Sequence, residues 1–124
     1  MKAIVAVNNL GFIGRGDQLM WRCKEDLQHF KRLTEGATCL VGWRTNEGLP
    51  PLPNRELVVD LRGEVIDPLT IDWCIGGKRT YEEWCGHFEE LHISHIDNDD
   101  IGDVVFPDLT DLNPNCKIFN YYFK

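Results

Sequence analysis

One acidic residue falls on what should be the buried side of a helix. When residues 23–34 are laid out at about 100° per residue, apolar side chains form one arc, and Asp26 lies in it between Phe30 and Leu33. A carboxylate in this place is either solvated at the rim of the helix or at the floor of a pocket. In a pocket its pKa would rise, and it could bind a planar ligand that offers two adjacent N–H donors. Trp21 would then be an apolar wall of that pocket, or ordinary core.

Two segments share the order of a strand, glycine and a basic helix start. The predicted strand at 71–77 ends in two glycines, and the one at 38–42 ends in one. In the first segment, Gly76 and Gly77 end the strand, and Lys78 and Arg79 follow. In the second, Gly42 ends the strand, and Arg44 and Thr45 lie in the helix start. Glycine lets a ligand approach the backbone, and a helix start offers unpaired N–H groups to an anion. Each segment alone could be an ordinary tight turn, but together they could hold one diphosphate.

Composition limits the classes of function. The chain has 124 residues, 43% hydrophobic and 27% charged, which predicts one globular domain over residues 1–124. Its net charge of −7 argues against nucleic acid or an anionic membrane as a partner. No apolar run approaches the roughly 18 residues of a membrane span, and the N-terminus lacks the cleavage site of a signal peptide.

Metal sites receive little support from the residue pattern. The five cysteines are scattered without a C-x-x-C pair, so we expect neither a disulfide framework nor a zinc site, and we expect a reducing cytoplasm. A cluster of Cys74, Cys85 and His87 can be drawn, although buried or idle thiols explain these residues better. The acidic run at 97–103 fits a calcium loop poorly and is interpreted as a solvated turn.

Strand-like and helix-like segments alternate along the chain, which predicts an α/β fold with a mainly parallel sheet and helices on both faces. Ligands should then lie at the carboxyl ends of the strands. Leu27 falls in the apolar arc of the first helix and His29 in its polar arc. The predicted strands are 2–7, 38–42, 56–61, 71–77, 90–96 and 116–123, and the predicted helices are 24–34, a brief one from Trp43, and 78–88, with a long loop at 8–22.

Five segments, taken in order, resemble dihydrofolate reductase. They are "AIVAVNNLGFIGRGDQLMWRCKEDLQHFKRLT", "VGWRT", "LPPLPNRELVV", "CIGGKRTYEEW" and "HISHIDNDDIGDVVFPD". The resemblance implies a mainly parallel central sheet with an antiparallel C-terminal strand. It also implies NADPH-dependent reduction of 7,8-dihydrofolate to tetrahydrofolate, with hydride added to C6 and a proton to N5.

The resemblance also assigns the substrate site. Asp26 matches the carboxylate that pairs with the pterin, Trp21 the tryptophan that holds an ordered water, and Ser94 a hydroxyl that supports the carboxylate. Arg55 matches the arginine that binds the α-carboxylate of the substrate's glutamate. The other implied substrate residues are Ile4, Val5, Ala6, Leu27, Phe30, Lys31, Leu49, Leu52 and Ile75, with Tyr81 as an aromatic hydroxyl near the nicotinamide.

For NADPH, the resemblance implies that backbone groups of Ala6 and Ile13 contact the nicotinamide carboxamide. Residues 14–20 match the family's lid, and Asp103 lies where a neighbouring loop would hold the lid shut. The implied cofactor residues also include Gly14, Gly42, Arg44, Thr45, Arg62, Gly76, Gly77, Lys78, Arg79 and Thr80.

Departures from the family concern the adenosine half of the cofactor. Only about ten residues, 62–71, join the third and fourth strands, which is too few for a helical crossover. Trp43 replaces a basic residue that commonly meets the 2′-phosphate, and Arg62 could substitute for it, so NADPH is favoured over NADH. The C-terminus supplies one strand where a hairpin is expected. We therefore expect weakened adenosine binding.

Two other functions stay open. One is a folate- or nucleotide-binding protein with weak catalysis and a structural or assembly role. The other is a reductase of a different pterin or of a pyrimidine on the same fold. The implied partners are dihydrofolate and antifolate-type inhibitors, with no nucleic acid, membrane or metal. We expect a monomer, with a dimer left open.

Overall fold

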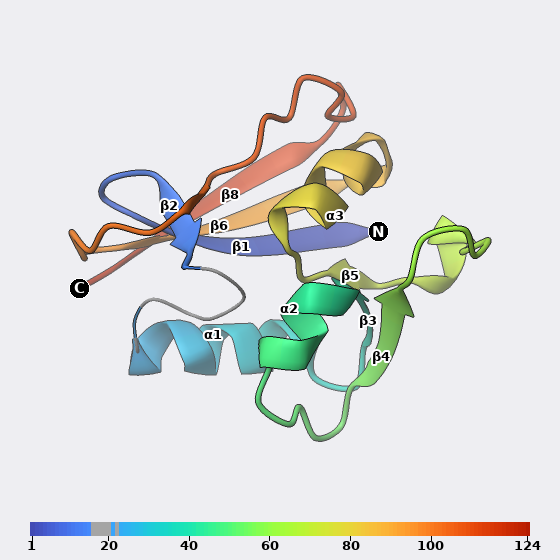
Figure 1. Cartoon of the computed structure of the whole chain (residues 1–124), viewed down its shortest axis with the longest axis horizontal. Helices are drawn as coiled ribbons and strands as arrows, with labels where there is room; N and C mark the ends of the chain where they lie inside the picture. Colours follow the sequence, from blue (N-terminus) through green and yellow to red (C-terminus); the bar gives the residue numbers. More distant parts are fainter. Residues whose placement is uncertain (16–20, 22) are drawn as a thin grey trace.

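A parallel β-sheet forms the centre of the molecule (Figure 1). The computed structural model describes residues 1–15, 21 and 23–124. Within these residues the sheet has six strands in the order β4-β3-β5-β1-β6-β8, and β2 and β7 form a separate antiparallel pair. The strands are β1 (Lys2–Asn8), β2 (Phe12–Gly14), β3 (Thr38–Gly42), β4 (Glu56–Asp60), β5 (Trp73–Cys74), β6 (Glu90–Ile96), β7 (Val104–Val105) and β8 (Lys117–Phe123). The helices are α1 (Lys24–Thr34), α2 (Trp43–Gly48) and α3 (Lys78–Trp84), with 3-10 turns η1 (Pro68–Thr70) and η2 (Cys85–His87).

Both faces of the sheet are covered, as predicted. Successive side chains of a strand point to opposite faces. In β1, Ala3 and Val5 therefore join a core with Tyr81 of α3, whereas Ile4 joins a second core that Phe30 of α1 contacts. Burying an aliphatic or aromatic side chain of this kind stabilises a fold by about 1.5–3 kcal/mol. Because β1 is central, its alternation places α1 and α3 on opposite sides of the sheet.

Helix α1 has the predicted bounds, but its inward face is rotated from the predicted one. Asp26 is half-buried. His29 is only 7% exposed and Leu27 is 41% exposed, so their assignments to the polar and apolar arcs were wrong. The reason is tertiary: the ring of Tyr121 lies 4.1 Å from that of His29, and Phe123 lies 5.7 Å away. These aromatic side chains of β8 extend the packing surface beneath α1.

The C-terminal strand β8 runs parallel to its neighbour, so the predicted antiparallel direction was wrong. Its register with β6 runs from Glu90 opposite Lys117 to Ile96 opposite Phe123. The connection at 97–116 returns the chain to the end of the sheet where β6 began. A parallel pair requires a crossover of about a dozen residues or more, and this connection is long enough to supply one.

The remaining elements differ from the predictions mainly in length. β5 occupies two residues of the predicted 71–77, and the helix predicted over 78–88 continues from α3 into the turn η2. β2 and β7 were not predicted, because strands of two or three residues show no measurable periodicity. The short connection at 62–71 holds only the turn η1, which the Asp67 carboxylate caps by accepting a hydrogen bond from the Leu69 N–H at 3.0 Å. No helix in the described part of the chain has the length and apolar character to cross a membrane.

The carboxyl ends of β3 and β5 are joined directly. The Gly42 N–H donates to the Gly76 carbonyl at 2.7 Å. A Cβ atom at Gly42 would lie 2.7 Å from Thr80 Oγ1, and one at Gly77 would lie 2.7 Å from Thr45 Oγ1. Glycine at these two positions therefore allows the start of each helix to approach the end of the neighbouring strand. We call this arrangement the glycine joint.

We predict that Gly42→Ala destabilises the protein by about 1–3 kcal/mol, because its methyl group overlaps the buried Thr80 side chain. Chemical denaturation measures the change. Thr80→Ala removes the overlapping oxygen, so the double variant should lose less stability than the two single losses added together. Strict additivity would show that the two side chains do not conflict.

Candidate active site

Asp26 sits in the first turn of α1. Burial raises the pKa of Asp26, and the nearby Ser94 hydroxyl and His29 ring partly offset that rise. Burial also lowers the pKa of His29, which Asp26 partly restores. A carboxylate at this position can therefore take up a proton more readily than a solvated one. The half-burial of Asp26 is what the pocket-floor interpretation requires, and the pocket itself stays a prediction.

Two buried polar atoms accompany this carboxylate. Ser94 lies on β6, directly opposite Ala6 of β1, and is 1% exposed. Its hydroxyl lowers the pKa of Asp26, but neither Oγ of Ser94 nor Nε2 of His29 has a hydrogen-bond partner among the described residues. Buried polar atoms normally have a partner. Such atoms beside a half-buried carboxylate therefore fit the binding of a polar ligand.

Apolar residues predicted around the ligand are only partly brought together. Ile4, Phe30 and Ile75 meet in the core on the α1 side of the sheet. Val5 packs in the α3-side core, so its side chain does not share that wall, because it alternates with Ile4 along β1. Leu27 is largely exposed.

Other predicted substrate residues are neither fully buried nor fully exposed. Ala6 and Trp21 are half-buried, as are Leu49 and Leu52 between α2 and β4. Among the described residues, no hydrogen bond joins Trp21 to Asp26.

Tyr81 is engaged with the backbone of β1. Its hydroxyl donates to the Ile4 carbonyl at 2.6 Å, and burial raises the pKa of Tyr81 well above its ordinary value. Gly76 has φ +110°, and a Cβ there would lie 3.1 Å from the Tyr81 oxygen. Tyr81 therefore positions β1 against the glycine joint.

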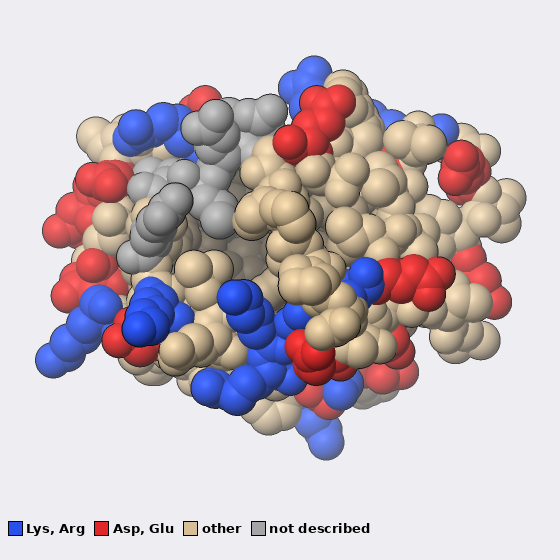
Figure 2. Space-filling view, turned by 90° about the horizontal axis from the view of Figure 1, so that it is seen from below, with Lys and Arg blue, Asp and Glu red and all other residues tan. Residues whose placement is uncertain are grey.

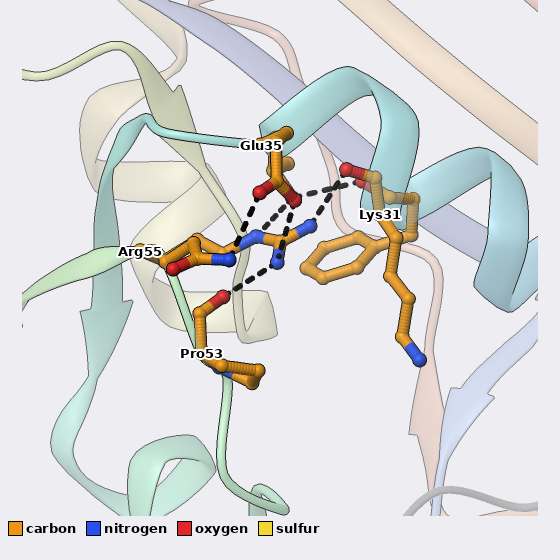
Figure 3. A network of polar contacts seen from close by, with 7 residues as sticks. Lys31, Glu35, Pro53 and Arg55 are labelled. Atoms are coloured by element: carbon orange, nitrogen blue, oxygen red, sulfur yellow. Dashed lines mark hydrogen bonds and ion pairs between the residues drawn. The ribbon is translucent and has the colours of Figure 1, made fainter.

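Arg55 is held by a network of polar contacts at the end of α1 (Figure 3). Its Nη2 donates to the Lys31 carbonyl at 2.6 Å, and its Nη1 to the Pro53 carbonyl at 2.7 Å. Nε donates to Thr34 Oγ1 at 3.1 Å, and Nη1 pairs with the Glu35 carboxylate at 3.2 Å. The Lys31 ammonium points away from the guanidinium. Sequence reasoning missed Glu35, whose only signal was its position directly after the helix.

The glycine joint brings together the residues predicted for a diphosphate. Arg44 and Thr45 begin α2, and Lys78 and Arg79 begin α3. On this acidic protein, Figure 2 shows that Lys and Arg side chains gather on part of one face of the molecule.

Three residues near the joint bear on the adenosine half of a cofactor. Arg62 follows β4, whose last residue Asp60 pairs with Gly42, so it lies near the same strand ends. Its N–H donates to Asp60 Oδ1 at 3.1 Å. The Arg44 guanidinium lies 5.2 Å from the ring centre of Trp43, which it covers.

Residues 8–15 are attached to the acidic segment at 97–106. The Asp103 N–H donates to the Gly14 carbonyl at 3.1 Å, and Arg15 Nη2 donates to the Ile101 carbonyl at 2.6 Å. Asn8 Nδ2 donates to the Asp100 carbonyl at 2.7 Å. The acidic run therefore supports the chain that leads into the predicted lid. Residues 16–20 of that lid lie outside the described residues.

Cysteines and metal-binding residues form no second site in the described chain. All five cysteines are free, and burial raises the pKa of Cys74 to about 12. Among the described residues, no three His, Cys, Asp or Glu side chains are grouped as a metal ion would require.

Comparison with known proteins agrees with this geometry. A family model described as dihydrofolate reductase matches residues 1–68, and dihydrofolate reductase type 1 of Escherichia coli is 32% identical over 88% of this chain and 82% of its own length. The chain belongs to the dihydrofolate reductase family. The Buchnera aphidicola dihydrofolate reductase is 28% identical over 98% of this chain and 84% of its own. A solved dihydrofolate reductase from Enterococcus faecalis, complexed with NADP(H) and RAB-propyl, superimposes with a TM-score of 0.75 at 25% identity, covering 88% of this chain and 77% of the other.

We predict that Asp26→Asn stabilises the protein at neutral pH. The pKa of Asp26 is raised in the folded state, so folded protein binds more protons than unfolded protein between the two pKa values. Stability of the wild type should therefore fall as pH rises from the ordinary Asp pKa, about 4, through the folded-state pKa. The variant does not lose stability in this way. Chemical denaturation at pH 4 to 8 should therefore show that its free energy of unfolding exceeds that of the wild type by an amount that grows with pH.

Glu25→Gln is the matched control, because it also removes a negative charge from the first turn of α1 but at an exposed position. A wild type that is more stable than Asp26→Asn at pH 7 would contradict the prediction.

Proposed function

We propose that this protein reduces 7,8-dihydrofolate to tetrahydrofolate with NADPH. The observation that carries the proposal is the half-buried Asp26 beside the buried Ser94 hydroxyl, on the same face of the sheet as Ile4. Family membership supports the same reaction. The half-buried carboxylate is suited to a heterocycle that presents adjacent N–H donors.

The residues present fit a dinucleotide cofactor. At the glycine joint, glycine at 42 and 77 lets Thr80 and Thr45 pack closely, which brings the starts of α2 and α3 and their backbone N–H groups to neighbouring strand ends, as a diphosphate site requires. Lys78 and Arg79 supply positive charge there. NADPH, when bound, supplies the hydride that C6 of the substrate accepts. The Enterococcus faecalis relative, which was solved with NADP(H), supports this choice of cofactor.

Asp26 anchors the pterin in this proposal. Its carboxylate accepts hydrogen bonds from the 2-amino group and the ring N–H, and its negative charge favours positive charge on the ring. Partial removal from water strengthens this interaction. In the geometry that the family resemblance implies, Asp26 does not reach N5, and water held near Trp21 delivers that proton. Ser94 supports the carboxylate.

Arg55 binds the glutamate end of the substrate. The proposal extends to antifolate-type inhibitors at the same pocket, to a single domain over residues 1–124, and to a location in the cytoplasm.

One observation favours a second candidate, a folate-binding protein with weak turnover. The connection at 62–71 supplies only the turn η1 beside the strands that would flank adenosine.

We predict that the wild type oxidises NADPH in the presence of dihydrofolate and that Asp26→Asn lowers kcat/KM by roughly 100-fold or more, the usual size for loss of one group that stabilises charge in the transition state. Absorbance of NADPH measures the rate. Glu25→Gln should retain the wild-type rate. Tight folate binding without turnover in any of the three proteins would support the second candidate instead.

We predict that Arg62→Ala raises KM for NADPH roughly tenfold, as loss of one charge-assisted contact to a phosphate would. KM for NADH should change little, because NADH has no 2′-phosphate, so NADH serves as the internal control. Equal changes for the two cofactors would show that Arg62 does not recognise that phosphate.

A further inference from the structure

The Glu35 carboxylate occupies a place on Arg55 where a ligand carboxylate is expected. It lies 3.2 Å from Nη1, and its side chain is 56% exposed, whereas that of Arg55 is 3% exposed. The other carboxylate oxygen accepts a hydrogen bond from Asn54 Nδ2 at 3.1 Å. Both oxygens are therefore engaged by donors from the segment before β4.

Most N–H groups of the Arg55 guanidinium already contact other groups of the protein. A guanidinium has five N–H donors. Thr34 accepts from Nε, Pro53 accepts from Nη1 and Lys31 accepts from Nη2, and the Glu35 carboxylate forms an ion pair with Nη1. Among the described contacts, the two N–H groups without a hydrogen-bond acceptor are one on Nη2 and one on Nη1, and the Nη1 nitrogen is the one paired with Glu35. A bidentate carboxylate needs two parallel N–H groups, so a ligand could bind in that way only by displacing Glu35.

The location of Glu35 is not explained by helix stability. It is the residue directly after α1, where the helix dipole disfavours negative charge. Arg55 caps this helix end through the Lys31 carbonyl and Thr34 without needing Glu35. Lys31, Arg32 and Glu35 line one open depression, so the Glu35 side of the ion pair faces solvent.

We propose that Glu35 is an internal competitor for the carboxylate site on Arg55, and that it lowers the protein's preference for folates that carry a glutamate tail over tail-less dihydropterins. The inference rests on the proposed function, which assigns the glutamate end of the substrate to Arg55. Binding of the tail exchanges one carboxylate for another on the same guanidinium. Tail-less dihydropterins meet no such competition.

Glu35→Gln tests this inference. The variant should lower KM for dihydrofolate, and Kd for folate, by about threefold to tenfold, because partly exposed ion pairs are weak. Its kcat, its KM for 6-methyl-7,8-dihydropterin and its Kd for 6-methylpterin should stay unchanged. Glu56→Gln is the control, because it removes an exposed carboxylate next to Arg55 in the chain and should alter neither ligand. In an Arg55→Ala background, Glu35→Gln should have no effect on folate binding.

Two results would overturn the inference. Weaker or unchanged folate binding in Glu35→Gln would show that Glu35 positions Arg55 for the ligand or only caps the helix. Equal tightening for folate and 6-methylpterin would show a general effect of charge.

Binding, measured by tryptophan fluorescence, separates this inference from the proposed function. If no protein turns over either substrate but Glu35→Gln still tightens folate selectively, the proposed reaction fails and the inference stands. If no variant binds folate, both fail.

Discussion

Asp26 can stay partly out of water only because α1 packs its first turn on the sheet, and that packing depends on the alternation of side chains in β1. Ile4 faces α1, whereas Val5 faces α3, so both sides of one central strand are buried. Desolvating a carboxylate is unfavourable and must be balanced by the surrounding core. The Ser94 hydroxyl and the His29 ring reduce this cost without removing it, which keeps the carboxylate reactive toward a ligand.

The helices and strands that could be predicted from sequence are those whose type and bounds follow from the residue pattern of the segment itself. The bounds of α1, β3 and β6 agree with the predictions, because each has a clear helical or strand period or ends at glycine. The direction of β8 could not be read from "CKIFNYYF", since the side-chain pattern of a strand is the same in either direction. It depends instead on how the connection at 97–116 crosses the sheet, which is a property of the whole chain.

The same distinction applies to the candidate site. Asp26 and the two glycine segments were recognisable because a charge in an apolar arc and a glycine before a basic helix start are local signals. The burial of His29 and the pairing of Glu35 with Arg55 were not, because each needs a partner from a distant segment. Tertiary contacts decided these side chains against their local preference, as they did for the exposed Leu27.

In the proposed function, the short connection at 62–71 makes cofactor binding depend more on the glycine joint. β4 is an edge strand of the sheet, and only the turn η1 lies between it and β5. Few surfaces are then available to the adenosine half of a dinucleotide, so its diphosphate must supply a larger share of the binding free energy. That share comes from backbone N–H groups and from a few basic side chains on a protein of net charge −7. Because charged contacts of this kind are screened by salt, cofactor affinity should depend more strongly on ionic strength here than in a relative with a full adenosine site.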